Sequence, residues 1–516
     1  MKKYLRNRRL FFVLILLYFI FQTNAASYAA KVQKPNIIVF LVDDMGLMDT
    51  SVPFMVDKNG KPKKYPLNNW YRTPGMERLA ALGIRFTDFY AHNVCSPSRS
   101  SILNGQNSAR HRTTNWIAQD HKNTGENGPP EWNYDGLTSK DVTLPVILRN
   151  EGYNTIIIGK AHLGAPNTEG AEPLNLGFDV NIAGCSIGHP GSYYGSQSYG
   201  RGKDNKIYRV PNLEKYHGTK TFLTEALTLE AKSEIDKSIQ NQKPFYLYMS
   251  HYAVHAPFES DPRFIKNYDE SKGKRAAAFA TLIEGMDKSL GDLIDHLEAR
   301  GIAENTLILF LGDNGSDAPI VSKSDINSSA PLRGKKGNKW EGGVRVPFIA
   351  AWASPNSKNK WQKKLPIQSG GVQEQIGACF DLFPTITKLI NIQVPKDHVV
   401  DGQCLNILLK GEKDPKRTNV FLSHFPHPRK DKKHFTTYRS GDWKLIYHYF
   451  PKLSGIKKGN CLLYNLKTDI SESNDLSQKH PEKVKELIAA MVEDLESKNA
   501  LYPVDKSGNI IKPKLP

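Results

Sequence analysis

Four apolar runs, each followed directly by polar side chains, most constrain the fold of this 516-residue chain. The first reads Asn-Ile-Ile-Val-Phe-Leu-Val over residues 36–42 and is followed by Asp43 and Asp44. A continuous apolar run of this kind predicts a strand that is buried on both faces, as in a parallel sheet covered by helices. The other runs occupy residues 153–158, 245–250 and 306–311. Because open parallel sheets hold their sites beyond the carboxyl ends of the strands, the polar residues that follow are candidate site residues.

These polar residues differ in how strongly they indicate a site. Two adjacent acids after a core strand favour a metal site over a solvated turn. Asp313-Asn314-Gly after the fourth run is by itself more typical of a turn, but its place matches that of the two acids. Carboxylate and amide oxygens suit Ca²⁺ or Mg²⁺ and are poor ligands for zinc. After the third run come His251 and His255, for which a structural role and a catalytic role are equally open.

A reactive cysteine is indicated by Cys-Ser-Pro-Ser-Arg at residues 95–99, which follows a predicted strand over residues 84–90. Pro97 suits the first position of a helix, where its missing N–H costs nothing. Backbone N–H groups in that first turn would face an anion bound above Cys95, and Arg99 adds a permanent positive charge. An isolated cysteine at such a place is more often a packing residue. A catalytic role for Cys95 therefore requires that the rest of the chain supply a metal site and proton-transfer groups.

The motifs together resemble those of the type I sulfatases of the alkaline phosphatase superfamily, in order and in rough spacing. The resemblance covers residue 34 to about residue 510 and includes two minor departures. Ala161 stands where an aromatic residue is frequent, and Gly334-Lys-Lys-Gly replaces Gly-Gly-Lys-Gly, which makes Lys336 the better match and Lys335 the alternative. The motifs are Asp-Asp-x-Gly-x-x-Asp at 43–49, Cys-x-Pro-Ser-Arg at 95–99, Gly-Lys-x-His-x-Gly at 159–164, His-Ala-Pro at 255–257, Gly-Asp-Asn-Gly at 312–315 and Lys-Gly at 336–337 before Glu-Gly-Gly.

The resemblance implies an α/β fold, with a large mixed, mostly parallel sheet between helices and a small C-terminal antiparallel sheet with a closing helix. We expect a catalytic domain over residues 31–395 and a C-terminal subdomain over residues 396–516. The resemblance also implies one divalent cation, calcium in most relatives, with Mg²⁺ as the alternative. Its ligands would be Asp43, Asp44, Asp313, Asn314 and the modified Cys95.

The roles of the other site residues are likewise implied by the resemblance. A formylglycine-generating maturation enzyme would oxidise Cys95, and a hydroxyl of the hydrated aldehyde, oriented by Arg99, would attack sulfur. Lys160 and Lys336 would hold the sulfate. His255, with Lys336 as a second candidate, would protonate the leaving oxygen, and His162 would take a proton from the second hydroxyl to restore the aldehyde.

Three functions fit these residues: a sulfuric ester hydrolase, a phosphonate or phosphate monoester hydrolase of the same superfamily, and a non-catalytic binder of sulfated glycans. The complete set of lysines and histidines favours sulfate, and a binder would lack a ligand or a base. A loop over residues 107–140 carries Trp116 and Trp132 among basic residues, which suits a sulfated carbohydrate, although a packing role is equally open. His424 and His427 are weak candidates for sugar contacts, and two surface histidines beside a proline are the favoured alternative.

Residues 1–30 carry the pattern of a secretory signal peptide, with five basic residues before an apolar run over residues 10–21. This run is short for a stable membrane span, so we expect an exported protein, periplasmic or secreted, rather than an anchored one. A hydrophobic content of 39% and a charged content of 24% exclude a disordered or membrane class.

The formal charge of +18 would attract polyanions, although a solvated lysine-rich surface is an equal alternative. No nucleic-acid-binding motif is present, so no nucleic acid partner is expected. Five cysteines are too few for a disulfide framework. The sequence leaves open the sugar, the sulfate position, exo or endo action, the oligomeric state and any pairing among Cys185, Cys379, Cys404 and Cys461.

Overall fold

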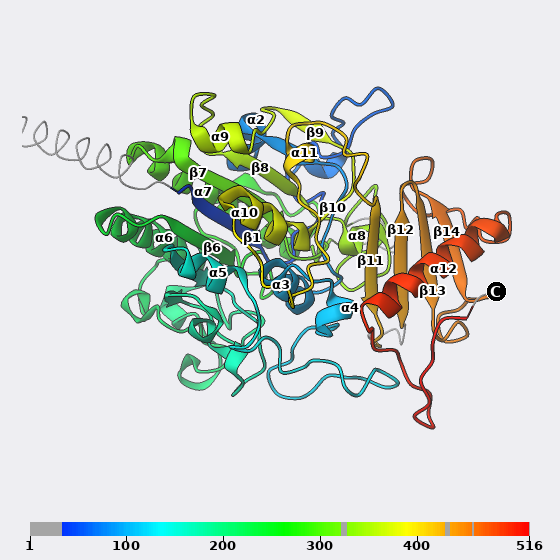
Figure 1. Ribbon diagram of the computed structural model, residues 1–516. Helices are drawn as coiled ribbons and strands as arrows, with labels where there is room; N and C mark the ends of the chain where they lie inside the picture. The colour runs from blue at the N-terminus through cyan, green and yellow to red at the C-terminus, as the bar shows by residue number, and fades with distance from the viewer. Residues whose placement is uncertain (1–33, 321–327, 429–433, 457–458, 515–516) are drawn as a thin grey trace, which may run out of the picture.

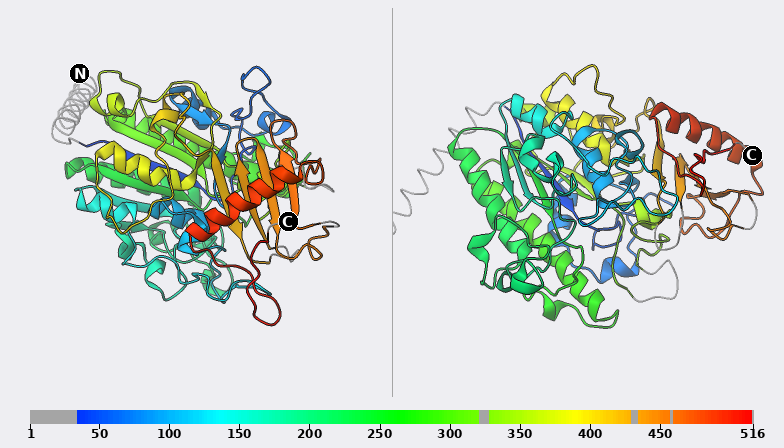
Figure 2. Two further views of the ribbon diagram at one scale, coloured as in Figure 1. Left: turned by 45° about the vertical axis from the view of Figure 1, so that its right-hand side comes forward. Right: turned by 90° about the horizontal axis from the view of Figure 1, so that it is seen from below.

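The computed structural model describes residues 34–320, 328–428, 434–456 and 459–514; the predicted signal peptide lies outside them. An eight-stranded mixed sheet with helices on both faces stands beside a four-stranded antiparallel sheet crossed by one long helix (Figure 1 and Figure 2). The predicted fold class is confirmed. Across the described part of the chain, no helix is both long enough and apolar enough to cross a membrane.

The four predicted apolar strands form the middle of the large sheet, whose order is β5–β4–β6–β1–β7–β8–β2–β9. Strand β1 pairs in parallel with both β6 and β7, and β6 pairs in parallel with β4. The carboxyl ends of these strands therefore meet at one edge of the sheet. Their bounds are Asn36–Val42 for β1, Asn154–Gly159 for β4, Phe245–His251 for β6 and Thr306–Gly312 for β7. The outer strands are β2 (Ile84–Phe86), β5 (Val180–Ile182), β8 (Phe348–Trp352) and β9 (Gly371–Gln373), and β3 (Phe89–Tyr90) pairs separately with β10 (Gly377–Ala378).

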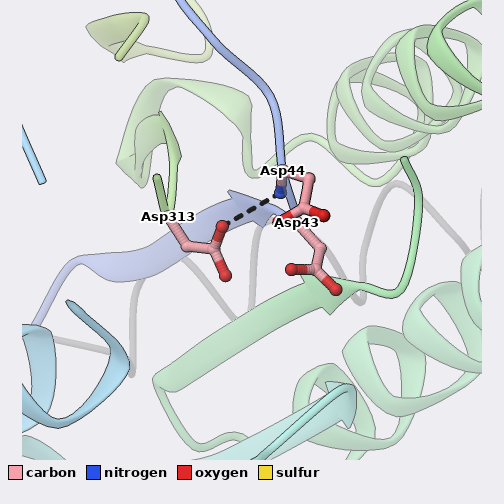
Figure 3. A group of neighbouring side chains, drawn as sticks. All are labelled: Asp43, Asp44 and Asp313. Atoms are coloured by element: carbon pink, nitrogen blue, oxygen red, sulfur yellow. Dashed lines mark hydrogen bonds between the residues drawn. The ribbon is translucent and has the colours of Figure 1, made fainter. Parts of the chain in front are cut away.

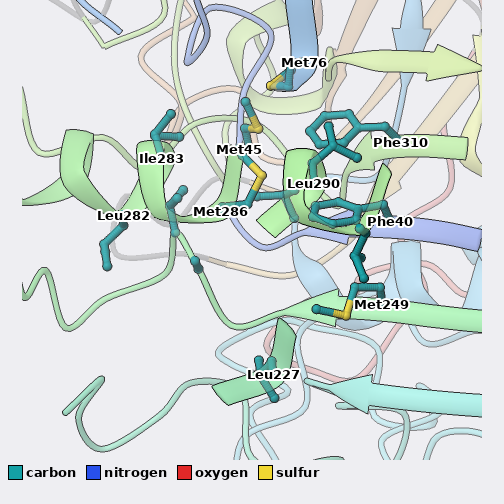
Figure 4. Packing of buried hydrophobic residues seen from close by; sticks show 14 of the residues in the cluster. Phe40, Met45, Met76, Leu227, Met249, Leu282, Ile283, Met286, Leu290 and Phe310 are labelled. Atoms are coloured by element: carbon teal, nitrogen blue, oxygen red, sulfur yellow. The ribbon is translucent and has the colours of Figure 1, made fainter. Parts of the chain in front are cut away.

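Both faces of the sheet are covered because alternate side chains of each buried strand point to opposite sides. Helices α2 (Pro74–Leu82), α6 (Leu223–Gln240) and α7 (Lys274–Ala299) share a core with Ile38, Phe40 and Val42 of β1. Helices α3 (Cys95–Asn104), α5 (Leu144–Asn150) and α10 (Leu382–Ile390) share the other core with Ile37, Val39 and Leu41. In the first core, Phe40 stacks on Phe310 at a centroid distance of 5.5 Å, near Met286 and Leu290 of α7 (Figure 4).

The second sheet consists of β11 (Val420–Phe425), β12 (Phe435–Ser440), β13 (Trp443–His448) and β14 (Cys461–Asn465), paired antiparallel in chain order. Strands β12 and β13 are joined by a turn at Gly441, whose φ is 55°. Helix α12 (Pro481–Ser497) packs Leu487, Ile488 and Met491 against this sheet. Shorter helices are α4 (Ser108–His111), α8 (Glu341–Val344), α9 (Lys360–Lys364) and α11 (Asn406–Leu409).

Candidate active site

The polar residues that follow the four central strands lie together at one edge of the large sheet. Three of them, Asp43, Asp44 and Asp313, are buried and place carboxylate oxygens within 4.8 Å of one another (Figure 3). The backbone N–H of Asp44 donates to Asp313 Oδ1 at 3.0 Å. The predicted ligands from β1 and β7 are thus brought to one place by the parallel pairing of these strands.

This cluster has the properties of a site for a hard cation. Asp43 Oδ1 and Asn314 Oδ1 are buried and have no hydrogen-bond partner among the described atoms. Buried polar atoms without a partner are rare and indicate a group that binds there. All the donors are oxygens, which Ca²⁺ and Mg²⁺ prefer. The residues present therefore fit the predicted cation.

Cationic side chains pair with each of the three carboxylates. Lys160 Nζ lies 2.7 Å from Asp43 Oδ2, and Lys336 Nζ lies 2.6 Å from Asp44 Oδ1. Arg99 is fully buried; its Nη2 lies 2.8 Å from Asp313 Oδ2 and its Nη1 donates to the Lys160 carbonyl. Arg99 therefore also ties the end of β4 to the end of β7.

Burial and these charges set the pKa values of the acids. Burial raises the pKa of Asp43 to about 6, although Lys160 opposes the shift. Burial likewise raises the pKa of Asp313 to about 6, and the nearby Asp43 carboxylate adds to the shift. Burial would also raise the pKa of Asp44, but His255 and Lys336 together hold it below its usual range.

Cys95 is the first residue of helix α3. The helix therefore begins two residues before Pro97, which was predicted to be its first residue. Pro97 is the third helical residue, still in the first turn, where its missing N–H removes no intrahelical hydrogen bond. Cys95 is 3% exposed, and its Sγ lies 3.3 Å from His162 Nδ1. The thiol of Cys95 therefore faces the ring of a histidine that follows strand β4.

The tautomer of His162 follows from its contacts. His162 Nε2 lies 2.6 Å from the carbonyl oxygen of Ile117, which can only accept a hydrogen bond, so Nε2 carries the proton. Nδ1 is then the basic nitrogen, and it faces residue 95. Burial, helped by the positive charge of Lys160, holds the pKa of His162 well below its usual range. His162 is thus a neutral ring with its basic nitrogen directed at Cys95.

His255, after strand β6, lies beside Asp44 of the cluster. Its Nε2 is 3.5 Å from Asp44 Oδ2, and its Nδ1 is 2.9 Å from the carbonyl oxygen of Ala256. Burial lowers the pKa of His255 to about 3, against the opposing effect of the Asp44 carboxylate. His251, the other histidine at this strand end, instead contacts Ser289 Oγ from within the core, which is a structural role.

The loop that carries Lys336 is fixed by its backbone. The N–H of Lys336 donates to the Ser316 carbonyl, and the N–H of Gly337 donates to the Asn93 carbonyl, at 2.9 and 2.8 Å. The adjacent Lys335, the alternative candidate, is half exposed and pairs with Asp317 at 3.2 Å. Lys336 is therefore the lysine of this loop that contacts the acidic cluster.

A buried group of charges, which sequence analysis did not identify, links this loop to the four-stranded sheet. Lys444 of β13 lies 2.9 Å from Glu341 of α8 and 2.8 Å from Glu472. Glu472 Oε2 also accepts from the N–H of Glu341 at 2.7 Å, and all three side chains are buried. Glu341 comes five residues after Lys336, so the C-terminal sheet holds the base of the lysine loop. We call Glu341, Lys444 and Glu472 the ionic link.

The two tryptophans predicted near a sugar pocket have different environments. Trp116 is 38% exposed, whereas Trp132 is buried and donates from Nε1 to Thr124 Oγ1. His424 and His427 are both buried and hydrogen-bonded, His427 Nε2 to Thr114 Oγ1 at 2.8 Å. Neither a sugar contact nor a surface position fits these histidines, so both interpretations of them were wrong. All five cysteines are free, which leaves no disulfide to assign.

Comparison with known proteins identifies the family. The sulfatase family model matches residues 35–392, and the model for the C-terminal region of N-sulphoglucosamine sulphohydrolase matches residues 340–500. N-acetylgalactosamine-6-sulfatase of Mus musculus is 31% identical over 405 residues, 74% of this chain and 68% of that protein. A sulfatase of Formosa agariphila is 28% identical over 509 residues, 87% of this chain and 85% of that protein.

Comparison with solved structures finds similar folds. The crystal structure of Ps i-CgsB in complex with k-i-k-neocarrahexaose aligns with a TM-score of 0.70 at 24% identity, covering 92% of this chain and 96% of that one. The family model covers more than half of the chain, and the murine relative shares nearly a third of the aligned residues. The chain therefore belongs to the sulfatase family: it is a type I sulfatase of the alkaline phosphatase superfamily and a sulfuric ester hydrolase.

Proposed function

We propose that this enzyme removes sulfate from sulfated carbohydrate, either polysaccharide or oligosaccharide. The observation that carries the proposal is the position of Cys95 Sγ, 3.3 Å from a neutral, basic His162 nitrogen at the edge of a buried oxygen-donor cluster. The murine relative is named for a sulfated sugar, and the basic chain would attract an anionic polymer. These observations support carbohydrate as the substrate class.

The nucleophile in this proposal comes from Cys95. A formylglycine-generating enzyme would oxidise it, and the hydrated aldehyde supplies the hydroxyl that attacks sulfur. Asp43, Asp44, Asp313 and Asn314 would hold a divalent cation with the modified residue 95, Ca²⁺ with Mg²⁺ as the alternative. When bound, the cation draws negative charge from the sulfate oxygens. Lys160 and Lys336, which already reach the cluster carboxylates, would contact the same oxygens.

Two histidines, one beside Asp44 and the other beside Cys95, would move the protons. His255 would protonate the leaving oxygen of the sugar, because the negative charge of bound sulfate would raise its pKa from about 3. His162 would take a proton from the second hydroxyl of residue 95, since its Nδ1 faces that residue and is unprotonated. Arg99, held by Asp313, would position the end of the nucleophile helix and add positive charge near it.

We also propose that residues 1–30 direct export to the periplasm or outside the cell, where sulfated polymers are met. The division into a catalytic domain over residues 31–395 and a C-terminal subdomain over residues 396–516 remains a prediction. Residues around the proposed boundary contribute to the core of the large sheet, since Leu405, Leu408 and Leu409 pack there.

The test is sulfate release from a panel of sulfated sugars by protein produced with a formylglycine-generating enzyme. The Cys95 peptide should be lighter than the thiol peptide by about 18 Da, and Cys95→Ala should abolish release because no other residue replaces the covalent step. Cys379→Ala, which changes a buried cysteine outside the site, is the matched control. Release by protein with an unmodified thiol would contradict the mechanism. Cleavage of phosphonate esters with no cleavage of any sulfate would favour the phosphonate hydrolase instead.

A further inference from the structure

The segment over residues 185–220 encloses both catalytic histidines. The N–H of His162 donates to the Cys185 carbonyl at 3.0 Å. A Cβ atom on Gly188 would lie 2.8 Å from His162 Cε1, so the backbone of this segment rests directly on that ring. Tyr193 donates from its hydroxyl to the carbonyl oxygen of His255 at 2.7 Å. The segment is therefore part of the wall of the site.

A row of contacting rings leads from the site along this segment. The rings of His255 and His189 are nearly parallel, with centroids 5.5 Å apart and an angle of 7° between their planes. His189 then contacts the ring of Tyr208 at a centroid distance of 4.3 Å. Arg201 Cζ lies 4.9 Å from the Tyr208 centroid, so a guanidinium ends the row. We call His189, Tyr208 and Arg201 the aromatic row.

The backbone of Arg201 is held by hydrogen bonds, whereas its charged side chain is exposed. Arg201 and Ile207 exchange both backbone hydrogen bonds at 3.0 Å, which closes a short hairpin around the tip of the segment. The side chain of Arg201 is exposed, and within the described residues no carboxylate pairs with it. The hairpin and the residues just after it are also basic, because Lys203, Lys206 and Arg209 lie there with Asp204 as the one acid.

The backbone in and around the hairpin adopts conformations that cluster at functional sites. Five non-glycine residues within eleven positions have φ values between 50° and 56°, a region that L-residues rarely adopt. Such strain persists only where the surrounding structure over-determines the conformation, and it clusters at functional sites. These residues are Ser198, Tyr199, Asp204, Asn205 and Tyr208.

We propose that the aromatic row binds a second anionic group on the carbohydrate, next to the sulfate ester that is cleaved. The inference rests on the proposed function, in which His255 protonates the leaving oxygen. The sugar that carries this oxygen would then lie beside His255 and next to His189, which stacks on it. The guanidinium fork of Arg201, at the end of the row, matches a sulfate or a carboxylate in bidentate geometry. The preferred substrates then carry two or more anionic groups, either as several sulfates or as a sulfate and a uronate.

The test compares kcat/KM on three substrates: an aryl sulfate with no other charge, a disulfated disaccharide, and a monosulfated disaccharide that contains a uronate. Arg201→Gln should lower kcat/KM on both disaccharides about tenfold, mainly through KM, and change the aryl sulfate by less than about twofold, because only the disaccharides reach the guanidinium. Arg201→Lys should retain part of the activity. Loss on one disaccharide alone would identify which anion is bound.

Lys358→Gln, an exposed lysine beyond the end of β8, at the far edge of the sheet, is the matched control and should change none of the three rates. An equal loss on all three substrates, or no loss on either disaccharide, would overturn the inference. Failure of the wild-type enzyme to cleave any carbohydrate while it cleaves the aryl sulfate would overturn the proposed function itself. The two failures are therefore distinct.

Discussion

Replacement of Lys444 by Met is expected to destabilise the protein strongly, although residue 444 lies outside the catalytic cluster. Lys444 is the one cation of the ionic link, and its side chain and those of Glu341 and Glu472 are at most 2% exposed. Methionine fills a similar volume but supplies no charge. Glu472 would then be left buried without its cation, whereas Glu341 would keep Arg345 and Arg439, each 3.6 Å from its Oε2.

The magnitude follows from the burial of the ionic link. Removal of one partner from a buried ion pair typically costs 3–5 kcal/mol, so we expect a loss of about 4 kcal/mol at pH 8. Burial raises the pKa of Glu472 from 4.5 to about 7, even though Lys444 lowers it. Without the lysine, this folded-state pKa rises further. A carboxyl with a raised folded-state pKa contributes stability below its unfolded pKa and loses it as the pH rises through the folded value, so the penalty should be smaller at pH 5 than at pH 8.

The assay is chemical denaturation at the two pH values, followed by far-UV circular dichroism. Lys467→Met, an exposed lysine just after β14, is the control and should change stability by less than about 0.5 kcal/mol. The double variant Lys444→Met/Glu472→Gln should recover most of the loss, because the stranded charge is removed while Glu341 keeps its arginine partners. Because the ionic link holds the base of the Lys336 loop, the single variant should also have a lower kcat at temperatures where it is folded.

A loss below about 1 kcal/mol at pH 8 would refute this reasoning, because it would mean that water reaches the glutamates. A larger loss at pH 5 than at pH 8 would refute the assigned direction of the Glu472 pKa.

Three further variants probe the cation site, the contact of Gly188 with the His162 ring, and the core of the large sheet. Asp313→Asn removes one of three carboxylates whose oxygens lie within 4.8 Å of one another. Millimolar Ca²⁺ should therefore raise the Tm of the wild type by at least twice as much as that of the variant. Equal shifts in Tm would contradict the cation site. Gly188→Ala would force the His162 ring to move, so kcat should fall by as much as about 100-fold. Gly291→Ala is the control and should leave kcat unchanged, because no atom lies within 4 Å of its new Cβ. Phe40→Ala should cost about 3–5 kcal/mol in the free energy of unfolding, measured in urea, because it leaves a cavity beside Phe310; a cost below about 1 kcal/mol would mean that the core collapses around it.

The framework of the site could be predicted because it depends on a local pattern. Each central strand is a continuous apolar run, and parallel pairing of such strands places the residues that follow them at one edge. Asp43, His162 and Asp313 could therefore be assigned to one site from their positions after the strands alone. The start of α3 was misplaced by two residues, because proline is also accepted at the third helical position.

Contacts between distant segments could not be predicted in this way. Lys444 is 103 residues from Glu341, and its partners depend on how the second sheet docks. A lysine between Trp443 and Leu445 is a weak signal of a buried charge, and it gives no partner. His427 was misjudged for the same reason, since its burial comes from the loop around Thr114 and Thr124 rather than from its neighbours in sequence.

The ionic link also has a consequence for the order in which the chain is made. Synthesis produces the acidic cluster residues of β1 and the Cys95 helix first, the Lys336 loop much later, and Lys444 and Glu472 close to the end. Until then, Glu341 at the base of the loop lacks both Lys444 and the carboxylate that accepts its backbone N–H. We therefore expect a nascent chain to be catalytically silent while its cysteine segment is still open to modification. Docking of the last strands would act as a checkpoint that couples activity to completion of the chain.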